Sequence, residues 1–127
     1  MGLPKVNRLK TPKEFRAVYQ RGQLYKSEHL VLRVLWITNQ TNPLKSTQFG
    51  ISISQKISKK AVIRNRMKRQ IKGAIRSLLP IIKPGARIVI SVRRPFGECK
   101  YEHFLRELKQ LLIKAKIIHG HKRKYFL

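Results

Sequence analysis

The feature that most constrains this chain is a long stretch without acidic residues. Between His29 and Gly97 there are 15 Lys or Arg residues and no Asp or Glu, and nine of the 15 fall in Lys56–Arg76. Over all 127 residues, 30 Lys and Arg face five acidic residues, which gives a formal charge of +25. Self-repulsion at this charge density weakens a compact fold unless anions neutralise it. The sequence therefore predicts a polyanionic partner, with nucleic acid first and an anionic membrane second.

Length and composition predict one folded domain over 1–127, with flexible ends at about 1–8 and 118–127. With 42% apolar residues, a chain of this length can bury roughly two thirds of the surface that it exposes when unfolded. Its single cysteine, Cys99, excludes an internal disulfide framework. No run is apolar enough to span a bilayer, and the N-terminus lacks the apolar stretch of a signal peptide. We expect a cytoplasmic protein.

A capping box predicts the start of the first helix. Thr11 can accept a hydrogen bond from the amide of Glu14, the Glu14 side chain can reach back, and Pro12 fits the first helical position. The expected helix covers 12–20. Gly22 is expected to end it, because glycine tolerates a left-handed backbone.

The rest of the chain predicts an α+β fold with a single sheet. Apolar and polar residues alternate over 47–54, which gives the sheet one buried face and one polar face. Ser58 is the expected N-cap of a long amphipathic helix. The predicted order is helix, two or three strands, helix, strand, helix, and the sheet therefore has three or four strands. The expected strands are 30–37, 47–54 and 86–94, and the expected later helices are 59–79 and 101–115.

One side of the long helix carries charge of a single sign. A run of charge is usually only a solvated face. Surface helices normally intersperse both signs, however, and here no Glu relieves the repulsion, which favours a phosphate-binding helix. Arg can fork onto phosphate oxygens, and Asn offers both a donor and an acceptor. The residues expected to bind nucleic-acid phosphates, and RNA if the family resemblance given below holds, are Lys56, Lys59, Lys60, Arg64, Asn65, Arg66, Lys68, Arg69, Lys72 and Arg76.

Phe15, Val18 and Tyr19 fall on one face of the first helix. Core packing is the simpler interpretation of such a stripe. The alternative is that Phe15 or Tyr19 edges a groove in which an unpaired base stacks, worth roughly 1 to 3 kcal/mol per base. Periodicity leaves the two interpretations about even. Tyr19 is the better candidate for a groove, because its hydroxyl tolerates water.

The sequence predicts no catalytic residue and no metal site. Two-metal phosphodiester chemistry needs clustered carboxylates, and five scattered Glu residues do not supply them. Glu98, Glu102 and Glu107 are interpreted as complements to the dipole of the last helix. His119 and His121 have no Cys or carboxylate companion for a metal.

The segment Ser54–Arg69 closely resembles the signature of the bacterial ribonuclease P protein component, in which an Arg-Asn-Arg helix follows a strand ending in Ser-x-Lys. Asn7–Leu9 is similar to the N-terminal pattern of that family, and Phe49–Ser54 is similar to its third strand. The resemblance covers about 7–115. It departs from the family at Arg33, where a Tyr is frequent, and it implies a left-handed strand-helix-strand crossover against the usual right-handed rule.

The resemblance also implies a division of labour. In that family an RNA with bound Mg²⁺ hydrolyses precursor tRNA and releases the 5′ leader, and the protein is its small partner. The chain would therefore bind no cofactor itself, its basic helix would dock on the catalytic RNA, and a cleft would hold the single-stranded leader. The residues that the resemblance implies for this cleft are Phe15, Tyr19, Arg33, Ser52, Arg64 and Asn65.

Two other classes of protein fit the composition. A structural ribosomal protein has the same charge, and only the context of Arg64, Asn65 and Arg66 argues against it. A membrane-active cationic amphipath is disfavoured, because the strand-like segments and the helical apolar stripe indicate a packed core. The preferred interpretation is the protein subunit of a tRNA-processing ribonucleoprotein. Its expected partners are the catalytic RNA and the leader of precursor tRNA, with no membrane partner.

Overall fold

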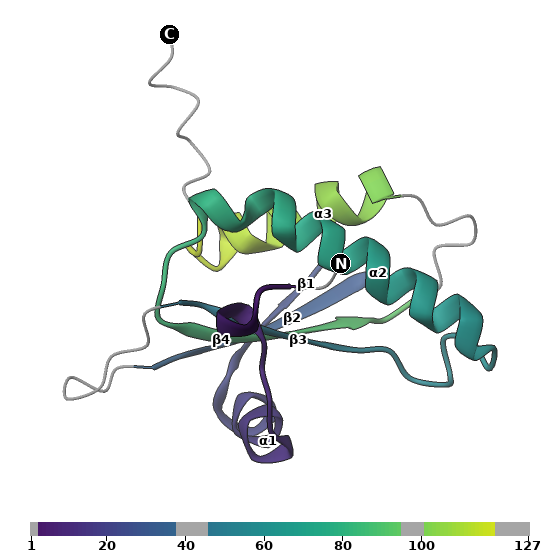
Figure 1. Ribbon diagram of the computed structural model, residues 1–127, viewed down its shortest axis with the longest axis horizontal. Coiled ribbons are helices and arrows are strands. Elements are labelled where there is room, and N and C mark those ends of the chain that lie inside the picture. The colour runs from purple at the N-terminus through teal and green to yellow at the C-terminus, as the bar shows by residue number, and fades with distance from the viewer. Residues whose placement is uncertain (1–2, 38–45, 95–100, 119–127) are drawn as a thin grey trace, which may run out of the picture.

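The computed structural model describes residues 3–37, 46–94 and 101–118. The elements in chain order are η1 (Lys5–Asn7), α1 (Pro12–Arg21), β1 (Gln23–Lys26), β2 (Leu30–Trp36), β3 (Gln48–Ser52), α2 (Ala61–Leu78), η2 (Leu79–Ile81), β4 (Ala86–Val92) and α3 (Tyr101–Lys114). The strands form one sheet in the order β1-β2-β4-β3. Helix α1 covers one face of the sheet, and α2 and α3 cover the other (Figure 1). The predicted α+β fold class is confirmed.

Two antiparallel pairs and one parallel pair build the sheet. β1 pairs with β2 and β2 with β4 in antiparallel fashion, whereas β3 and β4 are parallel and are connected by α2. The three predicted strands are present, each slightly shorter than expected. The prediction allows a fourth strand without placing it, and the four residues of β1, Gln-Leu-Tyr-Lys, lack the β-branched run that indicates a strand.

Helix α1 starts as its sequence predicts but ends differently. Thr11 Oγ1 accepts from Glu14 N at 3.1 Å, and Glu14 Oε1 accepts from Thr11 N at 3.1 Å, which completes the capping box. Gly22 follows the helix with an extended backbone (φ −74°, ψ 153°), so the predicted left-handed stop is wrong. Glycine is needed there because the backbone passes close to the end of the helix, where a Cβ would lie 2.5 Å from the carbonyl oxygen of Val18.

Helix α2 begins later than its sequence predicts. Its N-cap is Lys60, with no side-chain capping hydrogen bond, so the predicted cap at Ser58 is wrong. Ser58 is used in the turn before the helix instead. Its Oγ accepts from Lys60 N at 3.2 Å, and its carbonyl oxygen accepts from Arg64 Nη1 at 2.6 Å. The Ser58 hydroxyl is thus engaged by the backbone of Lys60, in a local turn that takes the place of helix capping.

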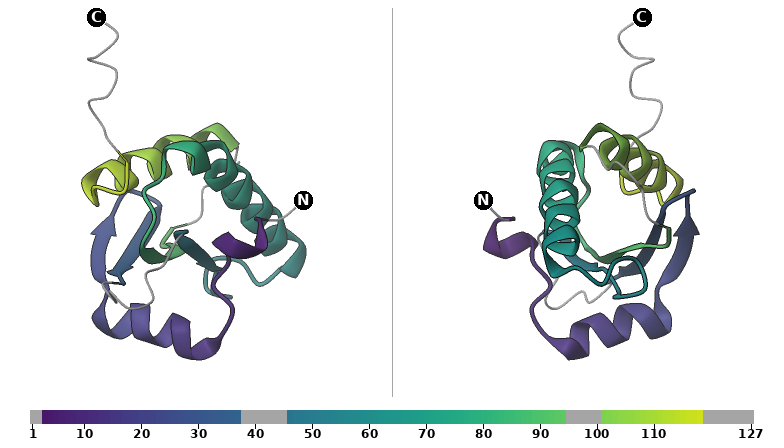
Figure 2. Two further views of the ribbon diagram at one scale, coloured as in Figure 1. Left: turned by 60° about the vertical axis from the view of Figure 1, so that its left-hand side comes forward. Right: turned by 90° about the vertical axis from the view of Figure 1, so that its right-hand side faces the viewer.

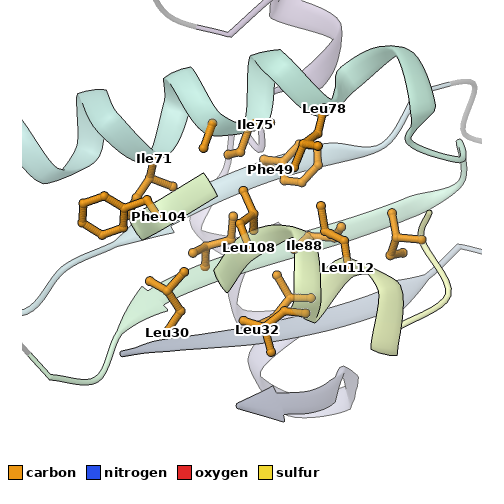
Figure 3. Close-up of a cluster of buried hydrophobic side chains, with 14 of the residues drawn as sticks. Leu30, Leu32, Phe49, Ile71, Ile75, Leu78, Ile88, Phe104, Leu108 and Leu112 are labelled. Carbon is orange, nitrogen blue, oxygen red and sulfur yellow. The ribbon is translucent and has the colours of Figure 1, made fainter. Parts of the chain in front are cut away.

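The hydrophobic core lies between the sheet and the layer formed by α2 and α3 (Figure 3). Helix α2 buries an apolar stripe, although Ile63 at its N-terminal end is only half-buried; the stripe consists of Met67, Ile71, Ala74, Ile75 and Leu78. Each fully buried Leu, Ile or Phe stabilises the fold by roughly 1.5 to 3 kcal/mol. Because this stripe faces the core, the opposite side of α2 faces solvent. The core side chains labelled in Figure 3 are Leu30, Leu32, Phe49, Ile71, Ile75, Leu78, Ile88, Phe104, Leu108 and Leu112.

The N-terminal segment, residues 3–9, packs against the edge of the sheet although much of it was expected to be flexible. Leu3 is buried in the core. Arg8 forms an isolated parallel bridge with Phe49, and Leu9 N donates to the Phe49 carbonyl oxygen at 3.0 Å. The segment therefore extends the sheet beyond β3 and lies beside α2 (Figure 2).

Candidate nucleic-acid interface

Helix α2 and the segment before it form a cationic face without a carboxylate. On this face, Arg66, Arg69 and Arg76 are exposed, whereas Lys68 and Lys72 are half-buried. Arg64 is also half-buried through its contact with the Ser58 carbonyl oxygen, and the neighbouring Lys56, Lys59, Lys60 and Asn65 are exposed. All ten residues expected to bind RNA thus lie on one continuous stretch. We call the exposed part, Asn65, Arg66, Arg69 and Arg76, the α2 face.

Tyr19 projects over the opposite face of the sheet and is 44% exposed. The Arg33 guanidinium carbon, from β2, lies 4.6 Å from the centroid of the Tyr19 ring, which is a cation–π distance. The Tyr19 hydroxyl lies 3.5 Å from Ser91 Oγ on β4. Tyr19 is therefore not a core residue, and it forms a polar, aromatic surface with strands far away in sequence.

Ser52 lies on the same sheet face, because it is in register with Ser91 and is exposed. We call the surface formed by Tyr19, Arg33, Ser52 and Ser91 the Tyr19 cleft, after the leader cleft that the family resemblance implies. Ser91 was missed by sequence reasoning. Its position between Ile90 and Val92 in a strand would have placed it on the polar face by simple alternation.

Phe15 lies one turn before Tyr19 and has a different environment. It is half-buried over Gly50, where an added Cβ would lie 2.3 Å from Phe15 Cζ. Gly50 is therefore covered by the ring, so the polar sheet face predicted over 47–54 is not open at this position. Glycine is required here because the aromatic ring rests directly on the backbone of β3.

A hollow of about 410 Å³ lies beyond Phe15, at the edge of the sheet. Arg8 from the N-terminal segment and both Lys68 and Lys72 from α2 line it. Phe15, which the resemblance implies for the leader cleft, therefore lines this hollow together with Lys68 and Lys72, which were expected on the RNA-docking helix.

Glu14 is the acidic residue beside these aromatic side chains. Its Oε2 lies 3.5 Å from Arg87 Nη2. Burial would raise the pKa of Glu14, but hydrogen bonds from the amides of Lys10 and Thr11, together with Arg87, outweigh it and hold the pKa below its usual value. Glu14 is thus an ionised helix cap and not a candidate general acid.

Glu107 has a structural role that its position in sequence does not suggest. It is buried in the middle of α3, where it accepts from the Ser27 hydroxyl and from His29 N at 3.0 Å, and its Oε2 lies 2.6 Å from His29 Nδ1. Burial would raise the pKa of Glu107, but these hydrogen bonds hold it below its usual value. The interpretation of Glu107 as a partner of the helix dipole is wrong, whereas Glu102 does lie in the first turn.

The described residues contain no cluster of His, Cys, Asp and Glu able to hold a metal ion. Over the same part of the chain, no helix is long and apolar enough to cross a membrane. Ile118 is buried. The remaining predictions, for Glu98, Cys99, His119, His121 and the rest of the end at 118–127, lie outside the described residues.

Comparison with known proteins agrees with the resemblance in the sequence. The family model described as Ribonuclease P matches residues 3–116. The ribonuclease P protein component of Rippkaea orientalis is 75% identical over 127 residues, with 100% of both chains covered. That of Microcystis aeruginosa is 57% identical over 121 residues, covering 95% of this chain and 100% of the relative.

Solved structures agree on the fold. The RNase P protein of Staphylococcus aureus gives a TM-score of 0.74 at 24% identity, covering 88% of this chain and 97% of that one. The RNase P protein of Thermotoga maritima gives 0.73 at 22% identity, covering 85% and 96%. A structural ribosomal protein and a membrane-active amphipath are not supported by these matches. The chain belongs to the ribonuclease P protein family.

Proposed function

We propose that this protein component of ribonuclease P contributes two RNA-binding surfaces and no catalytic residue to the endonuclease. Hydrolysis of a phosphodiester by metal ions needs ligands for those ions. In the described part of the chain the carboxylates are dispersed, and Glu14 and Glu107 are engaged in hydrogen bonds within the protein. The Mg²⁺ used in cleavage would then be held by the partner RNA, whose phosphates supply the ligands.

The α2 face is proposed to dock on the catalytic RNA. Arg66 and Arg69 are exposed on a helix that carries no carboxylate, and Arg forms forked hydrogen bonds with phosphate oxygens. Contacts of this kind fix position and orientation without reading sequence. The flanking residues Lys56, Lys59 and Lys60 would extend the same contact.

The Tyr19 cleft is proposed to hold the single-stranded 5′ leader of precursor tRNA, with Phe15 at its border. The observation that carries this proposal is the half-exposed Tyr19 ring stacked with Arg33 above the sheet. An exposed aromatic ring beside a cation grips unpaired bases with little sequence preference. Mature tRNA has no leader, so this surface would act on the substrate only.

The test is Tyr19→Ala in the enzyme assembled with its RNA. We expect affinity for precursor tRNA to fall about tenfold, because one stacked base contributes roughly 1 to 3 kcal/mol. Affinity for mature tRNA should not change. Trp36→Ala is the matched control, since Trp36 is an exposed aromatic residue (38%) at the far end of β2. Equal losses for both tRNAs would reject the leader site.

A further inference from the structure

The hollow at the edge of the sheet, which we call the edge groove, is separate from the Tyr19 cleft. It lies where the N-terminal segment runs beside α2 (Figure 2) and has a volume of about 410 Å³. This is within the range of roughly 300 to 1,000 Å³ found for small-molecule sites. Three cationic side chains line the groove, and they come from the N-terminal segment and from α2.

The charge in the edge groove is of one sign. Arg8, Lys68 and Lys72 line it, and none of the lining residues is acidic. Lys68 and Lys72 are four residues apart on α2, so their side chains are neighbours on one side of the helix. Both are half-buried, which strengthens their mutual repulsion relative to fully solvated lysines. An anion between them would relieve it.

The wall that carries Arg8 is fixed by the protein itself. Arg8 Nε donates to the Leu3 carbonyl oxygen at 2.6 Å, and the Leu3 side chain is 4% exposed. On the other side of Arg8, Leu9 N donates to the Phe49 carbonyl oxygen at 3.0 Å. The segment is therefore attached to the core and to β3 on both sides of its cation, and the groove exists without a ligand to shape it.

The remaining lining is largely apolar and aromatic. Leu9 and Ile51 are half-buried there, and Phe15 is held over Gly50. A phosphate ion gains nothing from such a wall, whereas the flat face of a nucleobase packs well on aromatic and aliphatic side chains. The groove thus combines a surface for a base with a site for the phosphate attached to it.

We propose that the edge groove receives one unstacked nucleotide of the catalytic RNA. Its phosphate lies among Arg8, Lys68 and Lys72, and its base lies against Phe15 and Leu9. The inference rests on the proposed function, because it takes α2 as the helix that docks on this RNA. It adds an anchoring site that combines stacking with charge to a face that otherwise contacts phosphates alone.

The test compares the footprint of the wild-type protein on the catalytic RNA with that of Leu9→Glu, which puts a carboxylate into the groove. Val6→Glu is the matched control, because Val6 belongs to the same segment and is 61% exposed. Single-nucleotide chemical probing should find one unpaired nucleotide that is protected by the wild type and by V6E but not by L9E. The rest of the footprint should stay the same.

A second pair of variants tests the groove without risk to its apolar packing. Lys72→Gln should remove the protection of that nucleotide, whereas Lys109→Gln, at an exposed lysine of α3 that does not line the groove, should keep it. Removing the base of the protected nucleotide should weaken wild-type binding about tenfold. For the L9E variant, by contrast, the abasic RNA and the intact RNA should bind with equal affinity.

Three results would overturn the proposal. The groove is not a receptor if no nucleotide loses protection with L9E or K72Q. It binds phosphate alone if the abasic RNA binds the wild type as tightly as intact RNA. It belongs to the leader path if the protected nucleotide lies in the precursor tRNA. Failure of the proposed function is a different result, namely wild-type binding to the catalytic RNA that is no tighter than to a control RNA of equal length.

Discussion

The α2 face and the Tyr19 cleft lie on opposite sides of one sheet and are built by different means. The α2 face comes from a single helix, whose buried stripe fixes which side chains point outward. The Tyr19 cleft comes from α1, β2, β3 and β4, and its four residues span positions 19 to 91. One surface depends on charge density, and the other depends on the packing that brings an aromatic ring over a guanidinium group.

This difference predicts two kinds of RNA binding. Phosphate contacts are weakened strongly by salt, because each one releases counterions. Stacking on Tyr19 is much less sensitive to salt, because it buries uncharged ring faces. If the proposed function holds, the same small domain would bind the catalytic RNA through the phosphates of that RNA and would distinguish precursor tRNA by its unpaired leader.

The largest expected effect is the salt dependence of binding to the catalytic RNA. If six to ten phosphates are neutralised, affinity should fall by about 10³ to 10⁵ between 50 and 200 mM salt. The ratio of precursor to mature tRNA affinities should change little over the same range. Binding titrations at several salt concentrations measure both quantities, and Arg66→Ala should reduce the salt slope by about one. A flat salt response would contradict the proposed role of the α2 face.

A smaller effect is expected from the scaffold that both surfaces share. Glu107→Gln should lower the unfolding free energy by about 1 to 3 kcal/mol at neutral pH, because a buried carboxylate with several hydrogen-bond donors is replaced. Both RNA affinities should then change together or not at all, when measured below the unfolding temperature. A change in only one of the two RNA affinities would show that Glu107 supports one surface and not the scaffold that both share.

The pH dependence of this variant follows from the lowered pKa of Glu107. A carboxyl group whose folded pKa lies below its ordinary value of 4.5 stabilises the fold above that value. This stabilisation is lost as the pH falls through the folded pKa. The difference in melting temperature between wild type and E107Q should therefore be largest near neutral pH and shrink below about pH 4.5. A difference that grows toward acid would show that Glu107 is protonated in the folded protein.

The smallest expected effect is at Arg33. Removing its cation–π contact with Tyr19 by Arg33→Ala should reduce precursor tRNA affinity by about twofold to fivefold, which corresponds to roughly 0.5 to 1 kcal/mol for an exposed pair. Binding of the catalytic RNA should stay the same. A larger loss for the catalytic RNA than for precursor tRNA would place Arg33 on the wrong surface.

Features set by neighbouring residues could be predicted from the sequence. The capping box of α1 and the buried stripe of α2 are examples, because each depends on residues within one or two helical turns. The cationic character of α2 follows from the same pattern. For Phe15 and Tyr19, periodicity left core packing and a groove about even, and only the family resemblance favoured a cleft.

Features set by tertiary contacts could not be predicted in this way. Gly22 is extended where β2 approaches it, and an added Cβ there would lie 3.2 Å from the Val34 carbonyl oxygen. The packed N-terminal segment depends on Leu3 reaching a core made by distant residues. Glu107 has the sequence context of a surface residue on an amphipathic helix, and its burial depends on hydrogen bonds from Ser27 and His29, which are far away in sequence.

The measurement that tests the central claim most directly is cleavage of precursor tRNA by the chain alone, by the catalytic RNA alone and by the two together. We expect the pair to release the leader at low Mg²⁺, the RNA alone to need more Mg²⁺, and the chain alone to cleave nothing at any Mg²⁺ concentration. Release of the leader by the chain alone, undiminished through successive purification steps, would contradict the account.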